Sequence, residues 1–382
     1  MINKKSIQIS QPSMGEAEWQ ALREPIFSGW ITQGPKVREF ENKFAQIHKV
    51  KHAIAVSNCT TALHLALVAL GVKEGDEVIV PAFTWVSTAN AVMYCNAKPI
   101  FIDIDPTTFN LDITQLKSKI TSSTKAIIAV HLFGLCANIN KIKEIAPGIK
   151  IVEDAACAAG ASLNGVPAGG LGDIGCFSFH PRKSVTTGEG GMLTTNDDAL
   201  AELLNQLRNH GASISEEQRH LGARPYILPE FDLVGYNYRM TDLQGALGSI
   251  QIDKLKGFIE ERNKWANFYE NALSKIDWII TPKAQEIYEH GWQSYVLMID
   301  ENKSPYKRNE IMEILQQNGI STRPGTHAVH MLSFYKNHFQ IGELDYPNAY
   351  NANQYSMSIP LHNLMVEDDY QYIVNTIKSL IK

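Results

Sequence analysis

Short apolar runs alternate with helical patterns between residues 52 and 210, and this alternation restricts the possible folds more than any other feature of the sequence. The runs that suit strands are residues 53–56, 77–80, 99–102, 126–130, 151–153, 175–179 and 192–194. The segment 61–70 between the first two carries leucines at 63, 67 and 70 on one helical face. Runs that are apolar on both faces and separated by helices predict an α/β fold with a mainly parallel seven-stranded sheet, covered on both sides.

A second, smaller α/β domain is predicted after this sheet. A long helical pattern begins at Met240, and further helical patterns follow near residues 307–317 and 368–380. We expect residues 1–254 to form an N-terminal segment and the large domain, and residues 255–382 to form the small one. A chain of 382 residues is long enough for two domains.

Composition and charge exclude several classes of partner. The net charge of −5 offers no basic field for nucleic acid or an anionic membrane surface, so we expect neither partner. No run of about 18 apolar residues occurs, and residues 1–12 lack the apolar stretch of a secretory signal, which predicts a cytoplasmic protein. The five cysteines have no Cys-x-x-Cys spacing and favour reduced thiols over disulfides or a metal site.

An acid that ends one predicted strand and a lysine that follows the next indicate a chemical site. Asp154 follows strand 151–153 and Lys183 follows strand 175–179, where ligands of parallel sheets bind. Pyridoxal phosphate needs an amine that forms a Schiff base with its aldehyde and a carboxylate that keeps its ring nitrogen protonated. Taken singly, Asp154 suits a strand-end cap and Lys183 a surface charge. Together they are candidates for this cofactor.

The run Gly170-Leu-Gly172-Asp-Ile-Gly175 satisfies the Gly-x-Gly-x-x-Gly pattern of dinucleotide-binding folds. It precedes an apolar run, whereas the dinucleotide motif follows a strand and opens a helix. We therefore predict a turn here.

Several spaced motifs together resemble the DegT/DnrJ/EryC1/StrS family of sugar aminotransferases, which are related to aspartate aminotransferase. These motifs are Glu153-Asp154-Ala-Ala, Ser178-Phe-His-Pro-Arg-Lys183-Ser-Val-Thr-Thr-Gly-Glu-Gly-Gly191 and Gly235-Tyr-Asn-Tyr-Arg-Met-Thr-Asp242. The resemblance covers nearly the whole chain. It implies a fold-type I pyridoxal phosphate-dependent transferase in which Lys183 binds the cofactor and transfers protons, and Asp154 holds the ring nitrogen.

The resemblance also implies a phosphate site where the first strand meets its helix. Thr60 and Thr61 would donate to the cofactor phosphate from this turn, and Ser178 from the strand before the lysine. A helix N-terminus suits a phosphate, but Asn58 or Thr60 serves equally well as a simple helix cap. Family members usually carry glycine where Cys59 stands.

Further cofactor contacts follow from the same resemblance. Trp85 would stack on the pyridine ring, although a tryptophan at this place also suits the core. Cys157 stands where relatives carry Gln or His against the cofactor's phenolic oxygen, and a thiol is a weaker donor. Asn237 and Arg239 would reach the phosphate of the neighbouring subunit, which implies a homodimer with shared active sites; the plain alternative is a polar turn.

Four residues are expected near the substrate. His327 and His330 would contact the sugar nucleotide from the small domain, in a segment that departs from the family's commoner proline-rich version. His180 lies beside the lysine, where packing explains it equally well. Glu189 belongs to the loop Thr186-Thr187-Gly188-Glu189-Gly190-Gly191, which resembles that of relatives acting at C4 of the sugar.

The resemblance therefore implies amination of a nucleotide-linked 4-keto-6-deoxy sugar, most simply UDP-linked, for a surface polysaccharide such as lipopolysaccharide O-antigen. L-Glutamate would be the donor and leave as 2-oxoglutarate, with pyridoxamine phosphate as the intermediate cofactor form. The alternatives are a 3-aminotransferase of a 3-keto sugar, a sugar dehydratase and a non-catalytic pyridoxal phosphate-binding regulator. Dehydratases of this kind replace the lysine by histidine, and Lys183 is present here.

Overall fold

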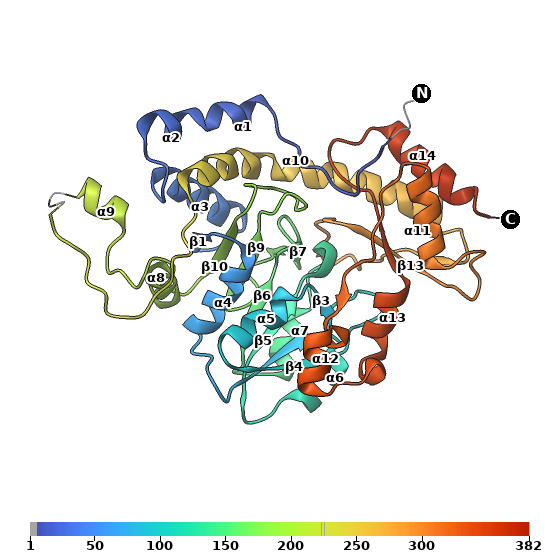
Figure 1. Cartoon of the computed structure of the whole chain (residues 1–382), viewed down its shortest axis with the longest axis horizontal. Coiled ribbons are helices and arrows are strands. Elements are labelled where there is room, and N and C mark those ends of the chain that lie inside the picture. Colours follow the sequence, from blue (N-terminus) through green and yellow to red (C-terminus); the bar gives the residue numbers. More distant parts are fainter. Residues whose placement is uncertain (1–5, 223, 225, 382) are drawn as a thin grey trace.

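Figure 1 shows a large domain built on a central sheet, next to a smaller domain formed mainly by the C-terminal part of the chain. This computed structural model describes residues 6–222, 224 and 226–381. Among the described residues no helix has the length and apolar character needed to cross a membrane.

All the expected strands join one seven-stranded sheet with the order β1-β10-β9-β6-β5-β2-β4. Only β10 runs antiparallel to its neighbours, so the prediction of a mainly parallel sheet is confirmed. Each strand lies within two residues of its expected bounds: β1 (His52–Val56), β2 (Glu77–Pro81), β4 (Lys98–Ile102), β5 (Thr124–Val130), β6 (Lys150–Asp154), β9 (Ile174–Ser178) and β10 (Gly191–Thr195).

Helices cover both faces of the large sheet because the strands are apolar on both sides. One hydrophobic cluster joins the sheet to α4 (Cys59–Ala69), α5 (Ser87–Tyr94) and α8 (Asp198–Leu207). A second joins it to α3 (Pro35–Ile47), α6 (Ile113–Lys119), α7 (Ile139–Ile145) and α10 (Asp242–Leu273). The helix expected over residues 61–70 is α4, which begins two residues earlier.

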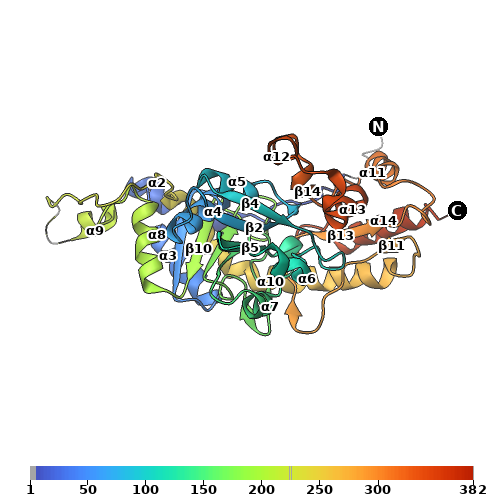
Figure 2. The same ribbon diagram turned by 90° about the horizontal axis from the view of Figure 1, so that it is seen from below.

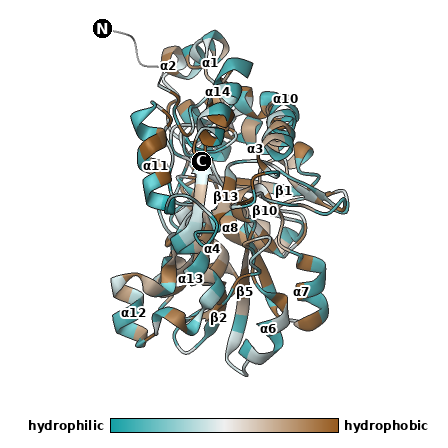
Figure 3. Ribbon diagram, turned by 90° about the vertical axis from the view of Figure 1, so that its right-hand side faces the viewer, coloured by the Kyte–Doolittle hydropathy of each residue, from teal (hydrophilic) through white to brown (hydrophobic). Residues whose placement is uncertain are grey.

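The small domain has its own core around an antiparallel sheet in the order β11-β13-β15. Its strands and helices are β11 (Ile279–Ile280), β13 (Tyr295–Ile299), β15 (Ser356–Ile359), α11 (Arg308–Gln317), α12 (Ser333–Phe339), α13 (Pro347–Tyr355) and α14 (Glu367–Lys378). Hydrophilic and hydrophobic residues alternate along α11 (Figure 3), as expected for a helix that packs on one side.

Two features cross the expected division between the domains. Helix α10 continues through residues 254 and 255 and runs from the large domain to the small one (Figure 1). Ile7 near the N-terminus forms a bridge with Ile320 and is buried in the small-domain core. The N-terminal segment therefore packs partly against the small domain.

Short strands also tie the domains together. β14 (His327–Ala328) pairs with β3 (Phe83–Thr84), and β12 (Tyr288–Glu289) pairs with β7 (Ser162–Leu163), which continues to β8 (Val166–Pro167). The remaining short helices are α1 (Glu16–Ala21), α2 (Arg23–Ser28), α9 (Glu216–Leu221) and the 3₁₀ turns η1 (Leu132–Gly134), η2 (Val329–Met331) and η3 (Glu343–Asp345). Figures 1 and 2 both show α9 projecting from the end of the molecule opposite the small domain.

Residues 170–173 of the glycine-rich run form a turn and residues 174–175 begin β9, so the run leads into a strand and its rejection as a dinucleotide motif is confirmed. Its backbone wraps around the buried carboxylate of Glu153, which accepts hydrogen bonds from the amides of Gly169, Leu171 and Gly172. Nε2 of His131 lies 2.8 Å from the same carboxylate. This fully buried network fixes the end of β6, where the next residue is Asp154.

Candidate active site

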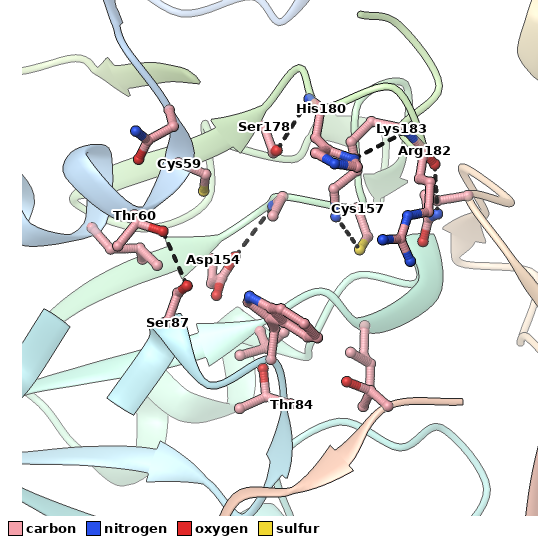
Figure 4. A pocket seen from close by; sticks show the side chains of 18 of the residues that line it. Cys59, Thr60, Thr84, Ser87, Asp154, Cys157, Ser178, His180, Arg182 and Lys183 are labelled. Atoms are coloured by element: carbon pink, nitrogen blue, oxygen red, sulfur yellow. Dashed lines mark hydrogen bonds between the residues drawn. The ribbon is translucent and has the colours of Figure 1, made fainter. Parts of the chain in front are cut away.

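A cavity of about 690 Å³ opens at the carboxyl ends of the strands, between the large sheet and the small domain. Strands β1, β6 and β9 all end at this edge, because β10 reverses the direction between β9 and β1. Figure 4 shows residues from these strand ends pointing into one space. The sequence-predicted residues that line it are Thr60, Thr61, Trp85, Asp154, Cys157, Ser178, His180, Lys183 and Glu189.

Lys183 lies in a turn that follows β9. Its backbone amide donates to the carbonyl of His180 over 2.8 Å, and its Nζ lies 3.2 Å from Sγ of Cys157 (Figure 4). The side chain is half-buried and has no carboxylate partner in the described part of the chain. The structure thus presents a lysine amine to the cavity without an ion pair to hold it.

Asp154 ends β6 and is buried, with 5% of its surface exposed. Thr88 donates to its Oδ2 over 2.8 Å, and the amide of Ala156 donates to Oδ1 over 3.3 Å. Burial raises the pKa of the Asp154 carboxyl, although the Thr88 bond and the nearby Lys183 oppose that rise. A buried carboxyl whose charge is not matched by a contacting cation suits a ligand that brings a positive charge, such as a protonated ring nitrogen.

The first turn of α4 forms the other end of the cavity from Lys183. Asn58 caps the helix by accepting a 2.9 Å bond from the amide of Thr61, so the alternative of a capping residue is confirmed for Asn58. The amides of Cys59 and Thr60 precede the first intrahelical bonds and have no acceptor within the helix. The hydroxyl of Thr60 donates to Ser87 over 3.0 Å. Free amides at a helix N-terminus suit a phosphate.

The loop after Lys183 touches this turn through a glycine. A Cβ on Gly191 would lie 2.5 Å from the carbonyl carbon and oxygen of Asn58, too close for any side chain. Gly188 has a φ of +84°, which other residues rarely adopt. The glycine-rich loop at residues 186–191 therefore lies directly against the turn before α4 and places Glu189 at the cavity.

Trp85 lines the cavity, whereas His327 does not line it and reaches only the ring of Trp85. Trp85 is 57% exposed although it is a large apolar residue, and its ring meets that of His327 edge to face with centroids 5.4 Å apart. An exposed indole in a cavity wall offers a surface on which a flat ring can stack. His330 is not brought to the cavity: it is fully buried, and its Nε2 lies 3.0 Å from the carbonyl of Glu343.

Asn237 and Arg239 lie outside the cavity of their own chain. Arg239 bridges to Val56 through its backbone and donates to Oδ1 of Asn209 over 2.9 Å. Asn237 is exposed and bridges to Asn209. The structure therefore does not bring these two residues together with Lys183 in one subunit.

Several residues of the site were not singled out from the sequence. Thr88 does not line the cavity; it is fully buried on α5 and donates to Asp154. Arg182 lines the cavity directly before the lysine, and its carbonyl accepts a 2.8 Å bond from Gln293. Arg323 and Gln293 reach the cavity from the small domain. Arg182 was visible in the quoted lysine motif, but nothing in the sequence pattern pointed to Gln293.

These groups fit pyridoxal phosphate. The free amides of α4 suit its phosphate, the buried Asp154 carboxyl suits its ring nitrogen, and the Lys183 amine suits its aldehyde. The exposed face of Trp85 suits the ring. Each part of the cofactor has a chemically matched group within one cavity.

Comparison with known proteins agrees with this assignment. The profile of the DegT/DnrJ/EryC1/StrS aminotransferase family matches residues 12–378. The chain is 37% identical to spore coat polysaccharide biosynthesis protein SpsC of Bacillus subtilis, over 100% of this chain and 99% of the relative. It is also 37% identical to GDP-perosamine synthase of Caulobacter vibrioides, over 98% of each chain. Among solved structures it is similar to Spr1654 from Streptococcus pneumoniae in its PMP form, with a TM-score of 0.91, 28% identity and coverage of 98% of this chain and 99% of the other.

The expected fold-type I architecture and the pyridoxal phosphate cofactor are confirmed by these matches. The family match leaves only short stretches at the two ends of the chain uncovered. The protein is therefore a pyridoxal phosphate-dependent sugar aminotransferase that belongs to the DegT/DnrJ/EryC1/StrS family.

Proposed function

We propose that the enzyme transfers the amino group of L-glutamate to C4 of a nucleotide-linked 4-keto-6-deoxy sugar and so produces a 4-amino sugar for a surface polysaccharide. The observation that carries this proposal is the placement of the Lys183 amine and the Asp154 carboxyl at one cavity, with Glu189 on its wall. The names of the relatives support the product class, since one acts in spore coat polysaccharide biosynthesis and another is a GDP-perosamine synthase.

Different cavity residues have different roles in the two half-reactions. When bound, pyridoxal phosphate supplies the electron sink and carries the amino group from one substrate to the other. Lys183 acts as general base and then general acid, because no carboxylate among the described residues pairs with its amine and holds it away from the reacting carbon. Asp154 keeps a proton on the ring nitrogen, and the α4 amides anchor the phosphate.

The choice of C4 rests on the loop that carries Glu189. The backbone carbonyl of Glu189 accepts hydrogen bonds from the Thr187 hydroxyl and from Nε2 of Gln244, both 2.6 Å long. These bonds hold the loop beside the lysine. A loop fixed at this place can decide which sugar carbonyl comes within the ~3–3.5 Å needed for attack. Its similarity to the loop of C4 enzymes therefore favours C4 over C3.

Product analysis tests this proposal. The pyridoxamine form is incubated with UDP-, dTDP-, GDP- and CDP-linked 4-keto sugars and with their 3-keto isomers, while recovery of the aldehyde form is followed by visible absorbance. We expect a UDP-linked 4-keto-6-deoxy sugar to react, and the GDP-linked one is the comparison that the perosamine synthase suggests. NMR that places nitrogen on C3, with C4 still bearing oxygen, would contradict the proposed position.

We also propose that the enzyme is a cytoplasmic homodimer with shared active sites. All five cysteines are free thiols, as a reducing compartment requires. The placement of Asn237 and Arg239 outside their own cavity supports a role in the neighbouring site.

Mixing two inactive variants tests the shared site. A Lys183→Ala subunit and an Asn237→Ala/Arg239→Ala subunit together leave one intact site in each heterodimer, so activity should return after subunit exchange. If exchange is verified by mass spectrometry and no activity returns, each site is built from a single chain.

A further inference from the structure

The loop at residues 186–191, next to the reactive lysine, is held from outside the cavity by one face of helix α10. Gln244 and Gln251 lie seven residues apart on this helix, so their side chains point to the same side, two turns apart. Nε2 of Gln244 donates to the carbonyl of Glu189 over 2.6 Å. Oε1 of Gln251 accepts from the amide of Thr186 over 3.3 Å. One helix therefore contacts the loop at two separate points.

The amide group of Gln251 is fixed in one orientation. The residue is 1% exposed, and its Nε2 donates to the carbonyl of Ser13 over 2.9 Å and to Oε1 of Glu18 over 2.7 Å. Reversal of the amide would set its NH₂ group against the Thr186 amide and its oxygen against the Glu18 carboxylate. Glu18 is itself buried on α1 and pairs with Lys254. The N-terminal helix α1 therefore supports the contact between α10 and the loop.

Thr186 connects this contact to the rest of the loop. Its hydroxyl donates to the carbonyl of Phe179 over 2.7 Å and accepts from the amide of Gly188 over 3.0 Å. Thr186 is 2% exposed and does not line the cavity, whereas Glu189 does. A shift of Thr186 therefore moves a part of the cavity wall without removing any group that touches a substrate.

We propose that Gln244 and Gln251, supported by Glu18, are positioning residues that determine which sugar carbonyl reaches the lysine. This inference rests on the proposed function, in which the loop at residues 186–191 selects the sugar carbon. None of the three side chains lines the cavity, so they act through the loop and not by contact with a substrate.

The two half-reactions should differ in how much they depend on this support. The sugar ring is rigid, and its candidate carbonyl positions C3 and C4 are neighbours, so a small displacement of the loop changes which of them is presented to the lysine. The amino donor is a flexible chain with a single reacting nitrogen and adjusts more easily. A misplacement of about 1 Å can cost about 100-fold in rate. Weaker support should therefore slow the sugar half-reaction more than the donor half-reaction.

Gln244→Glu separates the loop contact from the stability of the helix. Oε1 of Gln244 accepts from the amide and the hydroxyl of Thr241 in the capping box of α10, and a glutamate keeps these acceptors. A glutamate has no donor for the carbonyl of Glu189 and sets a negative charge against it. The variant should fold as the wild type does and hold the loop less tightly.

An exchange of two side chains tests the other contact. Gln251→Glu alone places a second carboxylate where a 2.7 Å hydrogen bond joins Gln251 to Glu18. In the double variant Glu18→Gln/Gln251→Glu the amide and the carboxylate change places, so Thr186 keeps an acceptor and Lys254 keeps a nearby carboxylate. The double variant should therefore recover most of the wild-type behaviour. If Gln251→Glu does not fold, Gln244→Glu alone decides the proposal.

Two measurements distinguish positioning from a general loss of structure. Hydrogen exchange of the holoenzyme, followed by mass spectrometry, should be about 10-fold faster in the peptide that contains residues 186–191 of each single variant. Single-turnover kinetics should show the 4-keto sugar reacting about 10–100-fold more slowly and a lower preference for it over the 3-keto isomer, while L-glutamate converts the cofactor at close to the wild-type rate. Gln371→Leu is the matched control, since Gln371 on α14 donates to Glu367 at the protein surface.

Three outcomes would overturn the proposal: unchanged exchange of the loop in Gln244→Glu, an unchanged sugar half-reaction despite faster exchange, or equal slowing of both half-reactions. Failure of the proposed function gives a different pattern. The wild type would then place nitrogen on C3, while the single variants would still loosen the loop and reduce the preference for the carbon that the wild type aminates.

Discussion

Both ends of the cavity suit a negative group, but they are built in different ways. At the α4 end the donors are backbone amides and hydroxyls, fixed by the helix cap at Asn58 and by the contact with Gly191. At the other end they are the long side chains of Arg182 and Arg323, which have no fixed partner among the described residues. Backbone donors hold their geometry without losing side-chain entropy, whereas guanidinium groups adapt to what enters.

This difference matches the lifetimes of the two proposed ligands. The cofactor stays bound through many turnovers and gains from rigid donors. The two substrates alternate in one cavity, and side chains that move aside let a carboxylate leave and a sugar enter. Asp154 lies between the two ends and Lys183 lies beside Arg182, and both serve both substrates. Variants of Lys183 or Asp154 should therefore affect both half-reactions. Variants at the α4 end should affect only cofactor binding, and variants at the other end should affect only substrate binding.

Lys183→Ala should have the largest effect. Turnover should fall at least about 10³-fold, because general acid–base catalysis alone contributes 10²–10⁴-fold and the covalent attachment is lost as well. The fold should persist, since the side chain is half-buried and Cys157 is the only hydrogen-bond partner of its Nζ within the described part of the chain. Steady-state kinetics gives the rate, and borohydride reduction with peptide mapping identifies the labelled lysine.

Lys150→Ala is the matched control for that experiment. Lys150 lies at the start of β6, where its Nζ pairs with Asp173 over 2.8 Å at the protein surface. Its loss should leave turnover unchanged. A borohydride label on any lysine other than Lys183 would refute the assignment.

Asp154→Asn should retain the cofactor but slow both half-reactions. A charge pair at about 4 Å in an effective dielectric near 20 is worth roughly 4 kcal/mol, which corresponds to about three decades in rate. An amide cannot hold the ring nitrogen protonated. Single-turnover kinetics of each half-reaction measures the effect. A kcat within about tenfold of the wild type would contradict the role of Asp154.

The sequence predicted the sheet well, and it pointed to Thr60 and Thr61, which line the α4 end of the cavity, because both depend on local pattern. The phosphate site at this end stays a prediction. Asp154 and Ser178 are the last residues of their strands and the α4 turn follows β1, so sheet topology alone brings them to one edge. Asn58 as a cap was likewise one of the alternatives that the sequence left open.

The small-domain side of the cavity was harder to predict. It depends on the pairing of β14 with β3, two strands of two residues each, which are too short for a periodic signal. His327 lies in β14, but the 3₁₀ turn η2 follows at once and carries His330 into the interior. Arg323 lines the cavity and bridges through its backbone to Ser358 of β15, a long-range contact that no local pattern encodes.

Thr60→Val should weaken only the cofactor end. The substitution removes a hydroxyl but keeps the branched shape, and loss of a hydrogen bond to a charged phosphate should raise the dissociation constant of the cofactor about 10-fold or more. The rate at which L-glutamate converts the cofactor-saturated enzyme should not change. Fluorescence titration of the apoprotein with pyridoxal phosphate measures the first quantity. An unchanged cofactor affinity would show that the amides of α4 suffice without the Thr60 hydroxyl.

The smallest effect concerns the stability of the cofactor-free protein. Because burial raises the pKa of Asp154, the folded apoprotein binds this proton more tightly than the unfolded chain does. The contribution of this group to the free energy of unfolding therefore falls as pH rises from the unfolded pKa, near 4, through the folded pKa. Asp154→Asn removes the buried charge, so the apo variant should melt at a higher temperature than the apo wild type at pH 7, by roughly 2–4 °C for each 1 kcal/mol gained.

The comparison with the holoenzyme makes that last test decisive. Once the cofactor supplies the missing positive charge, the wild-type carboxylate is paired and the amide is not, so the order of the melting temperatures should reverse. Scanning calorimetry of both proteins, with and without pyridoxal phosphate, gives the four values. If the apo variant is less stable than the apo wild type, the Asp154 carboxylate stabilises the folded protein without the cofactor, through its bonds to Thr88 and Ala156. That outcome would contradict our inference that the buried carboxylate lowers the stability of the apoprotein until a cation binds beside it.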